Sequence, residues 1–335
     1  MATEHDPGPV SAQARVARIE DAAAQPIQVG SGGWIRVGTA SWTDPTMTAS
    51  GVFYPAGADT AEERLGYYAS RFPIVEVDAT YYALPSARTS QLWVERTPPD
   101  FLFDVKAHAL MTGQPSETRR LPKILREALP ADLLAKPRVY AKDLPAEIRD
   151  GIWDTFLAGI APLRERGQLG SVLLQYPRWF YPSHESRESI LEAKARLGGV
   201  TCAVEVRHRS WLSEKNAERT IGFLADHAIP LVMVDGPQGL ASSVPPMLAV
   251  TSPELAIVRF HGRRADTWEA AGVPTVERYR YFYGREELDE WVPRIREASR
   301  QARDVHVLMN NCYANYGTTN AREIAALLAD VQSDA

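Results

Sequence analysis

Short apolar runs rich in β-branched residues recur eight times along the chain, and a longer stretch with helical character follows most of them. The runs are Trp34–Thr39, Ile74–Ala79, Phe101–Lys106, Val172–Tyr176, Thr201–Val206, Pro230–Val234, Ala256–Phe260 and Val305–Met309. The helical stretches include Glu62–Arg71, Ser186–Leu197, Ala217–His227, Arg285–Arg300 and Asn320–Val331. Alternating strands and helices are typical of a parallel sheet covered by helices. Eight such units predict a single (β/α)₈ TIM barrel, with an open doubly wound sheet as the alternative.

Chain length and composition predict one barrel domain preceded by an N-terminal tail. The 335 residues, 45% of them hydrophobic, are enough for one large core. Residues 1–33 are rich in Ala, Gly, Gln and Pro, and we expect a flexible N-terminal tail before a barrel domain over residues 34–332. No run of about 18 apolar residues predicts a membrane span, and the N-terminus lacks a signal-peptide core. With only Cys202 and Cys312, we expect a cytoplasmic protein without a disulfide framework.

One connection is much longer than a barrel needs. The third and fourth predicted strands are separated by residues 107–171, whereas a strand–helix–strand connection needs as few as about 10–12 residues. This long insertion contains a plausible helix, Ile152–Leu163, and a basic stretch over residues 117–142 with seven Lys and Arg against three acidic residues. A solvated surface excursion explains the stretch, and a lid or flap that faces an anion is the alternative.

Polar side chains interrupt the apolar strands near their C-terminal ends. They are Glu76, Asp78 and Thr80 in the second strand, Asp104, Lys106 and His108 in the third, Gln175 in the fourth, Glu205 and Arg207 in the fifth, Asp235 in the sixth, Arg259 and His261 in the seventh and Asn310 in the eighth. Residues two apart share a face of a strand, and positions under helices should be apolar. We therefore expect these groups to point inward at the C-terminal mouth, where the active sites of TIM barrels lie.

Charge and proton chemistry suggest roles for these residues. Glu205 and Glu76 are the candidate proton acceptors, and His261 is the candidate proton carrier. Lys106, Arg207 and Arg259 are suited to gripping a phosphate or carboxylate. The other candidate substrate-binding residues are Asp78, His108, Gln175, Asp235, Asn310, Trp42 and Tyr82.

Each of these residues also has a structural interpretation. Glu76 and Glu205 could only pair with Lys106 and Arg207, and Asp78 could cap the next segment. Both histidines, His108 and His261, could be hydrogen-bonded without chemistry. The aromatic residues Trp42 and Tyr82 could serve packing alone.

Ordered motifs along the chain resemble the DUF72 family, also called YecE-like. They include Gly38-Thr39-Ala40-Ser41-Trp42, Phe53-Tyr54-Pro55, Val75-Glu76-Val77-Asp78-Ala79-Thr80-Tyr81-Tyr82, Phe103-Asp104-Val105-Lys106, Leu174-Gln175-Tyr176-Pro177, Val204-Glu205-Val206-Arg207-His208-Arg209-Ser210-Trp211, Val258-Arg259-Phe260-His261-Gly262 and Asn310-Asn311. The resemblance covers about residues 34–330 and implies a TIM barrel, but it implies no settled activity. The chain departs from the pattern at Asp78, at Met111-Thr112-Gly113 and at Cys312-Tyr313.

The sequence favours an enzyme that acts on a small anionic or sugar-like substrate by acid–base or electrostatic catalysis. We expect a hydrolase, a lyase or an isomerase. No glycine-rich phosphate loop follows a strand, so we predict no organic cofactor. One alternative is a metal-dependent phosphodiesterase resembling endonuclease IV, with a divalent metal held among Glu76, Asp78, His108, Glu205, Asp235 and His261. A glycosidase using Glu76 and Glu205 is a weaker alternative.

A non-catalytic nucleic-acid or phospholigand binder is the alternative from a different class. The basic stretch at 117–142 and the pair Arg263-Arg264 favour it, whereas the net charge of −5 opposes it. The sequence does not determine the oligomeric state.

Overall fold

The computed structural model describes residues 4–17 and 22–330, and all eight predicted strands are present in it with small shifts at their ends. In sheet order they are β8 (Cys202–Glu205), β7 (Leu169–Gln175), β4 (Leu102–Lys106), β3 (Ile74–Val77), β2 (Trp34–Ala40), β11 (Asp304–Met309), β10 (Leu255–Phe260) and β9 (Val232–Asp235). The first of them in the chain pairs with the last, so the order around the sheet is that of a TIM barrel, with β8 and β9 at its ends. The fold is α/β, with eight parallel strands whose order is that of a TIM barrel.

The chain forms two compact units, which we describe separately. Unit 1 consists of residues 1–76 and 209–335, and unit 2 consists of residues 77–208. The predicted domain of residues 34–332 spans both units. None of the helices in the described part of the chain is both long and apolar enough to cross a bilayer.

Unit 1 carries most of the helices that follow the early and late strands. These elements are α1 (Pro9–Val16), η1 (Ala22–Ala24), β1 (Ile27–Gln28), α2 (Pro45–Ser50), α3 (Ala61–Ala69), η6 (Arg209–Leu212), α9 (Ala217–Asp226), α10 (Ala265–Trp268), α11 (Thr275–Arg278), α12 (Arg285–Asp289), α13 (Val292–Gln301) and α14 (Tyr316–Ala329). A capping box of Thr60 and Glu63 starts α3. The predicted helix Arg285–Arg300 is two helices, because Pro293 lacks an N–H and is tolerated only in the first turn of α13.

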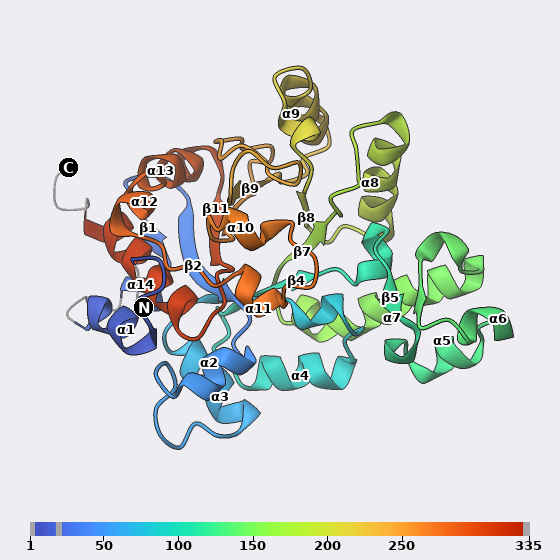
Figure 1. The fold of residues 1–335 in the computed structure, drawn as a ribbon, viewed down its shortest axis with the longest axis horizontal. Helices are drawn as coiled ribbons and strands as arrows, with labels where there is room; N and C mark the ends of the chain where they lie inside the picture. Colours follow the sequence, from blue (N-terminus) through green and yellow to red (C-terminus); the bar gives the residue numbers. More distant parts are fainter. Residues whose placement is uncertain (1–3, 18–21, 331–335) are drawn as a thin grey trace. The chain divides into compact units, whose positions relative to one another are not determined.

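The pairing of β2 with β11 brings the two ends of the chain together. Six residue pairs are in parallel register, from Asp304 opposite Trp34 to Met309 opposite Thr39 (Figure 1). On the other side of β2, Gly38 lies so close to β3 that a Cβ there would be 2.2 Å from the carbonyl oxygen of Ile74. Only glycine permits this approach of the two strands.

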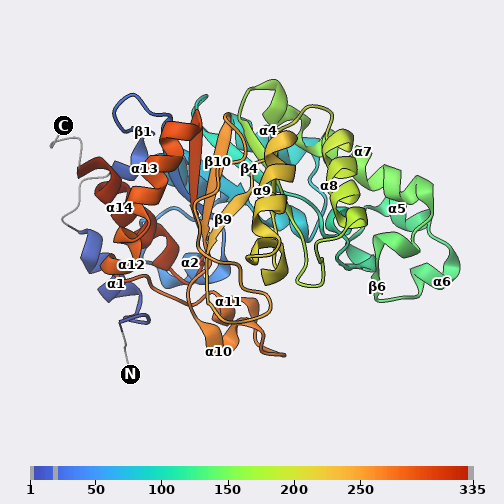
Figure 2. The ribbon, with the colours of Figure 1, turned by 90° about the horizontal axis from the view of Figure 1, so that it is seen from above.

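The segment before the barrel has ordered contacts that the sequence did not indicate. Helix α1 lies beside α14 (Figure 1 and Figure 2), and Ala12 packs with Phe282 and Tyr316 in a buried cluster. Arg15 Nε is 2.6 Å from Glu323 Oε1, and strand β1 pairs antiparallel with β2. The flexibility of residues 1–33 stays a prediction, but their described parts include secondary structure that packs on unit 1.

Unit 2 contains the long connection between β4 and β7. Its elements are η2 (Ala79–Tyr81), α4 (Ala87–Glu95), η3 (Ala109–Thr112), β5 (Ser116–Glu117), η4 (Thr118–Arg120), α5 (Lys123–Glu127), α6 (Ala131–Leu134), β6 (Arg138–Val139), η5 (Ala141–Asp143), α7 (Ala146–Glu165) and α8 (His184–Arg196). The predicted helix Ile152–Leu163 lies within α7, which packs against α4. The strands β5 and β6 form a separate antiparallel pair.

We predict that Arg15→Gln destabilises the protein more at pH 7 than at pH 4. Burial raises the pKa of Glu323, and Arg15 opposes that rise. A carboxyl group whose pKa is higher in the folded than in the unfolded protein stabilises the fold at pH values below the unfolded pKa. This stabilisation is lost as the pH rises through the folded pKa, because the buried group is then charged. Without Arg15 the buried carboxylate should cost about 1–2 kcal/mol more at pH 7.

Urea unfolding at the two pH values measures this difference. The control is Arg300→Gln, which removes a surface pair with Glu297 and should change stability little at either pH. Equal losses for Arg15→Gln at pH 4 and pH 7 would contradict the assignment.

Candidate functional site

A fully buried ion pair joins two strands of unit 1 that are not neighbours. Arg259 Nη2 on β10 is 2.7 Å from Glu76 Oε1 on β3, and the two side chains are 1% and 0% exposed. Strands β2 and β11 lie between β3 and β10 in the sheet. The pair therefore spans the concave face of this part of the sheet, and both predicted residues point inward. Arg259 is thus a partner of Glu76 that the structural interpretation of this residue had not named.

His261 and Asn310 also lie together in unit 1, directly after β10 and β11. The Asn310 side-chain nitrogen is 2.8 Å from His261 Nδ1. An amide nitrogen only donates, so with the Asn310 amide in this orientation Nδ1 accepts and Nε2 carries the ring proton. The buried ring packs beside Trp268 and Tyr279, at centroid distances of 5.8 and 5.9 Å. This arrangement holds one tautomer of His261, which is what a defined proton donor requires.

Asp235 faces the helices instead of the concave side of the sheet. It is paired in register with Phe260, the neighbour of the inward-pointing Arg259, and successive residues of a strand point to opposite faces. Its carboxylate accepts hydrogen bonds from the Tyr283 hydroxyl at 2.7 Å and from Trp291 Nε1 at 2.7 Å. The expectation that Asp235 points into the mouth is therefore not met.

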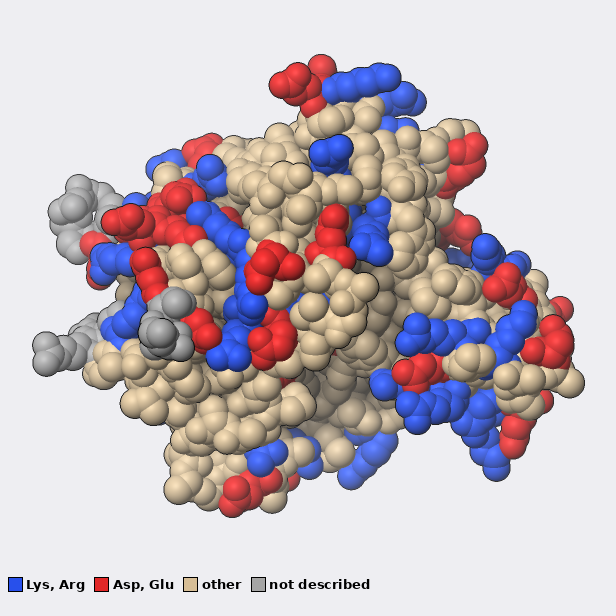
Figure 3. Space-filling view, in the orientation of Figure 1, with Lys and Arg blue, Asp and Glu red and all other residues tan. Residues whose placement is uncertain are grey.

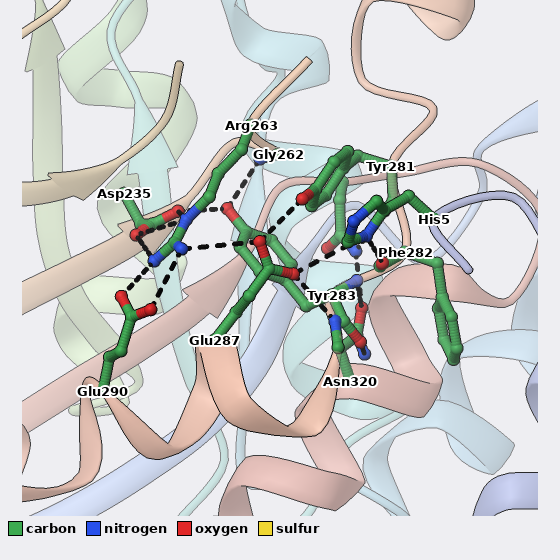
Figure 4. A network of polar contacts seen from close by, with 12 residues as sticks. His5, Asp235, Gly262, Arg263, Tyr281, Phe282, Tyr283, Glu287, Glu290 and Asn320 are labelled. Atoms are coloured by element: carbon green, nitrogen blue, oxygen red, sulfur yellow. Dashed lines mark hydrogen bonds and ion pairs between the residues drawn. The ribbon is translucent and has the colours of Figure 1, made fainter. Parts of the chain in front are cut away.

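The same carboxylate holds Arg263, which extends the network (Figure 4). Arg263 Nη2 is 2.8 Å from Asp235 Oδ2 and 2.7 Å from Glu290 Oε2, and Nη1 is 3.4 Å from Glu287 Oε1. Burial lowers the pKa of Arg263, but the hydrogen bonds from these carboxylates outweigh it and raise the pKa above its usual range. The network fastens the loop after β10 to α12 and to Glu290 and Trp291, which lie between α12 and α13.

Sequence reasoning missed this network. It noted Arg263 and Arg264 only as basic residues available to a nucleic acid, whereas Arg264 pairs with Asp266 at 3.1 Å. The aromatic partners Tyr283 and Trp291 follow no strand or helix periodicity that could have identified them. The only usable signal was a lone aspartate at the end of an apolar strand.

Trp42 has a backbone role in unit 1. It is 7% exposed, and its carbonyl oxygen accepts a hydrogen bond from the Tyr54 hydroxyl. These contacts agree with the packing interpretation, and substrate binding by Trp42 stays a prediction.

In unit 2, two predicted residues, Gln175 and Arg207, hold the carboxylate of a third, Glu205. Gln175 Nε2 donates to Glu205 Oε1 at 2.7 Å, and Arg207 Nη1 is 3.3 Å from the same oxygen. Gln175 and Glu205 are register partners in β7 and β8. The Glu205 side chain is fully buried, whereas Arg207 is 14% exposed. An orienting amide and a guanidinium thus hold a carboxylate at the C-terminal ends of two adjacent strands.

Lys106 lies on the same face of the sheet as this carboxylate. It is the last residue of β4 and is paired with Leu173 of β7, two residues before Gln175. Because residues two apart share a face, Lys106, Gln175 and Glu205 project from one side. Its Nζ lies 4.7 Å from the centroid of the Tyr81 ring, a cation–π distance.

Three other predicted residues of unit 2 lie beyond the strands. Strand β3 ends at Val77, so Asp78 lies between this strand and η2. Tyr82 is 43% exposed, and the Arg120 guanidinium lies 5.6 Å from the centroid of its ring. His108 follows β4, and its Nδ1 accepts from the Leu110 N–H at 3.4 Å.

Burial lowers the pKa of His108 to about 4, so the ring is neutral at pH 7. Its Nε2 lies 3.3 Å from Ser116 Oγ. These contacts correspond to the interpretation of His108 as a hydrogen-bonded structural histidine.

A metal centre has no assembled ligand set in residues 4–17 and 22–330. No group of three or more His, Cys, Asp and Glu side chains there could hold an ion. The donors named for a phosphodiesterase instead have other contacts, such as Glu76 with Arg259 and Asp235 with Arg263.

Comparison with known proteins identifies the family of this chain. Residues 36–335 match the family model described as "Protein of unknown function DUF72". The curated relative UPF0759 protein YunF of Bacillus subtilis (strain 168) is 31% identical over 302 residues, which cover 88% of this chain and 94% of the relative. The chain belongs to the DUF72 family.

Solved structures of DUF72 family proteins are similar to this chain. The Thermotoga maritima MSB8 structure has a TM-score of 0.67 and 31% identity and covers 88% of this chain and 98% of its own. The Enterococcus faecalis V583 structure has a TM-score of 0.70 and 25% identity and covers 88% of this chain and 95% of its own. They support the fold over nearly the whole matched length.

We predict that Asp235→Asn lowers the free energy of unfolding by about 2–4 kcal/mol, because it leaves Arg263 without its most buried partner. Chemical denaturation followed by circular dichroism measures this loss. The matched control Asp289→Asn affects a surface contact with Arg285 at 3.8 Å and should cost about 0–1 kcal/mol. Similar losses in the two variants would show that the network contributes no special stability.

Proposed function

We propose that this protein is an enzyme that acts on a small substrate carrying a phosphate or carboxylate, with Glu205 as its acid–base group. The observation that carries the proposal is the buried Glu205 carboxylate, held by Gln175 and Arg207 on the face of the sheet that also carries Lys106. All four residues belong to unit 2.

The charges around Glu205 suit an anionic substrate. Arg207 Nη1 bonds to Glu205 Oε1, and the planar guanidinium group is well suited to binding a phosphate or carboxylate. Lys106 adds a compact positive charge at the end of the neighbouring strand. A buried carboxylate with Arg207 beside it and Lys106 on the same face of the sheet can accept a proton from a substrate whose anionic group these cations hold. The reaction classes that this supports are hydrolysis and lyase or isomerase chemistry.

We consider the candidate residues of unit 1 separately. Within unit 1, we propose that His261, held by Asn310 through Nδ1, can carry a proton on Nε2. The pair of Glu76 and Arg259 is nearly inaccessible, so we propose that it orients the polar groups around it. Asp235 is not included, because its carboxylate is already occupied by Arg263, Tyr283 and Trp291.

The test is to screen the purified protein against phosphorylated sugars and small carboxylates and to assay the variants on any compound that is turned over. Glu205→Gln should lower kcat by about 10²–10⁴-fold while leaving the fold intact, because it removes the proton acceptor but keeps the shape. Arg207→Met should mainly raise KM. The control is Glu188→Gln on the exposed face of α8.

Turnover retained in Glu205→Gln would remove this residue from the catalytic set. Loss of activity with loss of the circular dichroism spectrum would instead assign it to stability. The same assay can be applied to Gln175→Leu. This variant should lower kcat less than Glu205→Gln does if Gln175 only positions the carboxylate.

A second candidate function, binding of nucleic acid or another phosphate-bearing ligand, rests on a basic groove in unit 2. The groove has a volume of about 610 Å³ and is lined by Glu117, Thr118, Arg119, Arg126, Leu134, Ala135, Lys136, Pro137 and Arg138. Arg126, Lys136 and Arg138 form no ion pair with any residue that the structure describes. Figure 3 shows Lys and Arg gathered over the region of α5 and α6, with acidic residues among them.

If this groove binds nucleic acid, a fluorescent single-stranded 20-mer should bind with an affinity that falls at least about tenfold between 50 and 200 mM salt. Replacing Arg126, Lys136 and Arg138 together by Gln should remove the binding. The control replaces Arg164, Arg166 and Lys215, exposed residues outside the groove, and changes the net charge equally. Absence of binding at 50 mM salt would exclude this candidate.

A further inference from the structure

A second pocket in unit 2 lies on the helix side of the sheet. Its volume is about 380 Å³, and its walls come from η3, α7, α8 and the segment that follows β7. Tyr176 lines it, and the preceding residue, Gln175, points to Glu205. Because neighbouring residues at the end of a strand face opposite ways, Tyr176 is directed away from the Glu205 cluster. This pocket is therefore separate from the site proposed above.

Aromatic side chains form much of the wall. The Tyr176 and Phe180 rings are stacked, with centroids 4.1 Å apart and planes inclined by 14°. Trp153 and Trp179 also line the pocket, and Trp179 is 49% exposed although it is a large apolar residue. Flat, partly exposed aromatic faces around a concave space favour a planar ring as the occupant.

The positive charge available to an occupant is at Arg149. Of the two lining arginines, Arg196 is bound by Asp150 at 2.8 Å and by Glu192 at 3.0 Å. Arg149 donates to the carbonyl oxygen of Leu144 at 3.1 Å and forms no ion pair within residues 4–17 and 22–330. The lining carboxylate Glu192 is already neutralised by Arg196, so an anionic group would be attracted to Arg149.

The hydroxyl of Tyr176 provides an additional observation. The residue is 3% exposed, and its hydroxyl has no hydrogen-bond partner among the described residues. A buried hydroxyl without a partner is unfavourable. An acceptor atom of a bound molecule would remove that penalty.

We propose that this pocket binds a small planar aromatic molecule with one anionic substituent. The ring stacks against Trp179 and the Tyr176–Phe180 pair, and the anionic group pairs with Arg149. A volume of about 380 Å³ lies within the usual range for small-molecule sites, roughly 300–1,000 Å³. The proposal does not depend on the catalytic role of Glu205.

Isothermal titration of the full chain with three probes of one ring tests the charge preference. Indole-3-acetate, indole and tryptamine carry a negative, a neutral and a positive group on the same ring. We expect saturable binding with affinity falling in that order. Absence of saturable binding for indole-3-acetate, or tryptamine binding as tightly, would overturn the proposal.

Variants locate the binding. Trp179→Ala should weaken indole-3-acetate binding by about tenfold or more, because aromatic stacking is lost. Arg149→Gln should abolish the preference for indole-3-acetate over indole. Tyr176→Phe should weaken binding of the anionic probe without lowering thermal stability, since the hydroxyl has no hydrogen-bond partner among the described residues.

Two matched controls complete the experiment. Trp34→Ala removes an indole that is 43% exposed in unit 1, and Arg164→Gln removes an exposed cation from α7 outside the pocket. Both should bind indole-3-acetate as the unmodified protein does. If either control weakens binding as much as its matched pocket variant, the proposed location is wrong.

Discussion

The parallel pairing of β2 with β11 is the contact on which unit 1 depends. Six residue pairs, from Trp34 with Asp304 to Thr39 with Met309, join segments near opposite ends of the chain. Such a long loop is entropically costly to close, and the strands recover that cost through a continuous ladder and buried side chains. Once β2 and β11 are adjacent, Glu76 and Arg259 reach each other from the strands on either side. The packing of α1 on α14 belongs to the same assembly.

Strand alternation then divides the polar residues between two environments. Arg259 points to the concave face, whereas Asp235, in register with the next residue, points to the helices. In unit 2, Gln175 points to Glu205, and the following residue Tyr176 lines a pocket among the helices. A shift of one position along a strand therefore separates a candidate catalytic group from a structural network or a second pocket.

The buried carboxylate of Asp235 has several partners, because an unpaired charge in the protein interior is very unfavourable. Asp235 is surrounded by an arginine, a tyrosine hydroxyl and an indole N–H, which together satisfy both of its oxygens. The family motif residue Asn311 has a similar structural role, since its amide bonds the Tyr281 carbonyl and the Asn320 side chain. Some residues that mark the family thus hold loops in place, and their presence alone does not identify catalytic groups.

The sequence by itself determined the eight strands, most of the helices and the family, because apolar periodicity and ordered motifs are local properties of the chain. It also located Glu205, Gln175 and Lys106 at strand ends, where the register between β4, β7 and β8 places them on one face. Only the tertiary structure decided that Asp235 serves a network, that His108 is buried and neutral, and that residues 9–16 form a helix against α14. Those outcomes depend on which distant side chains arrive as neighbours, since partners such as Trp291 for Asp235 have no signature in the local sequence.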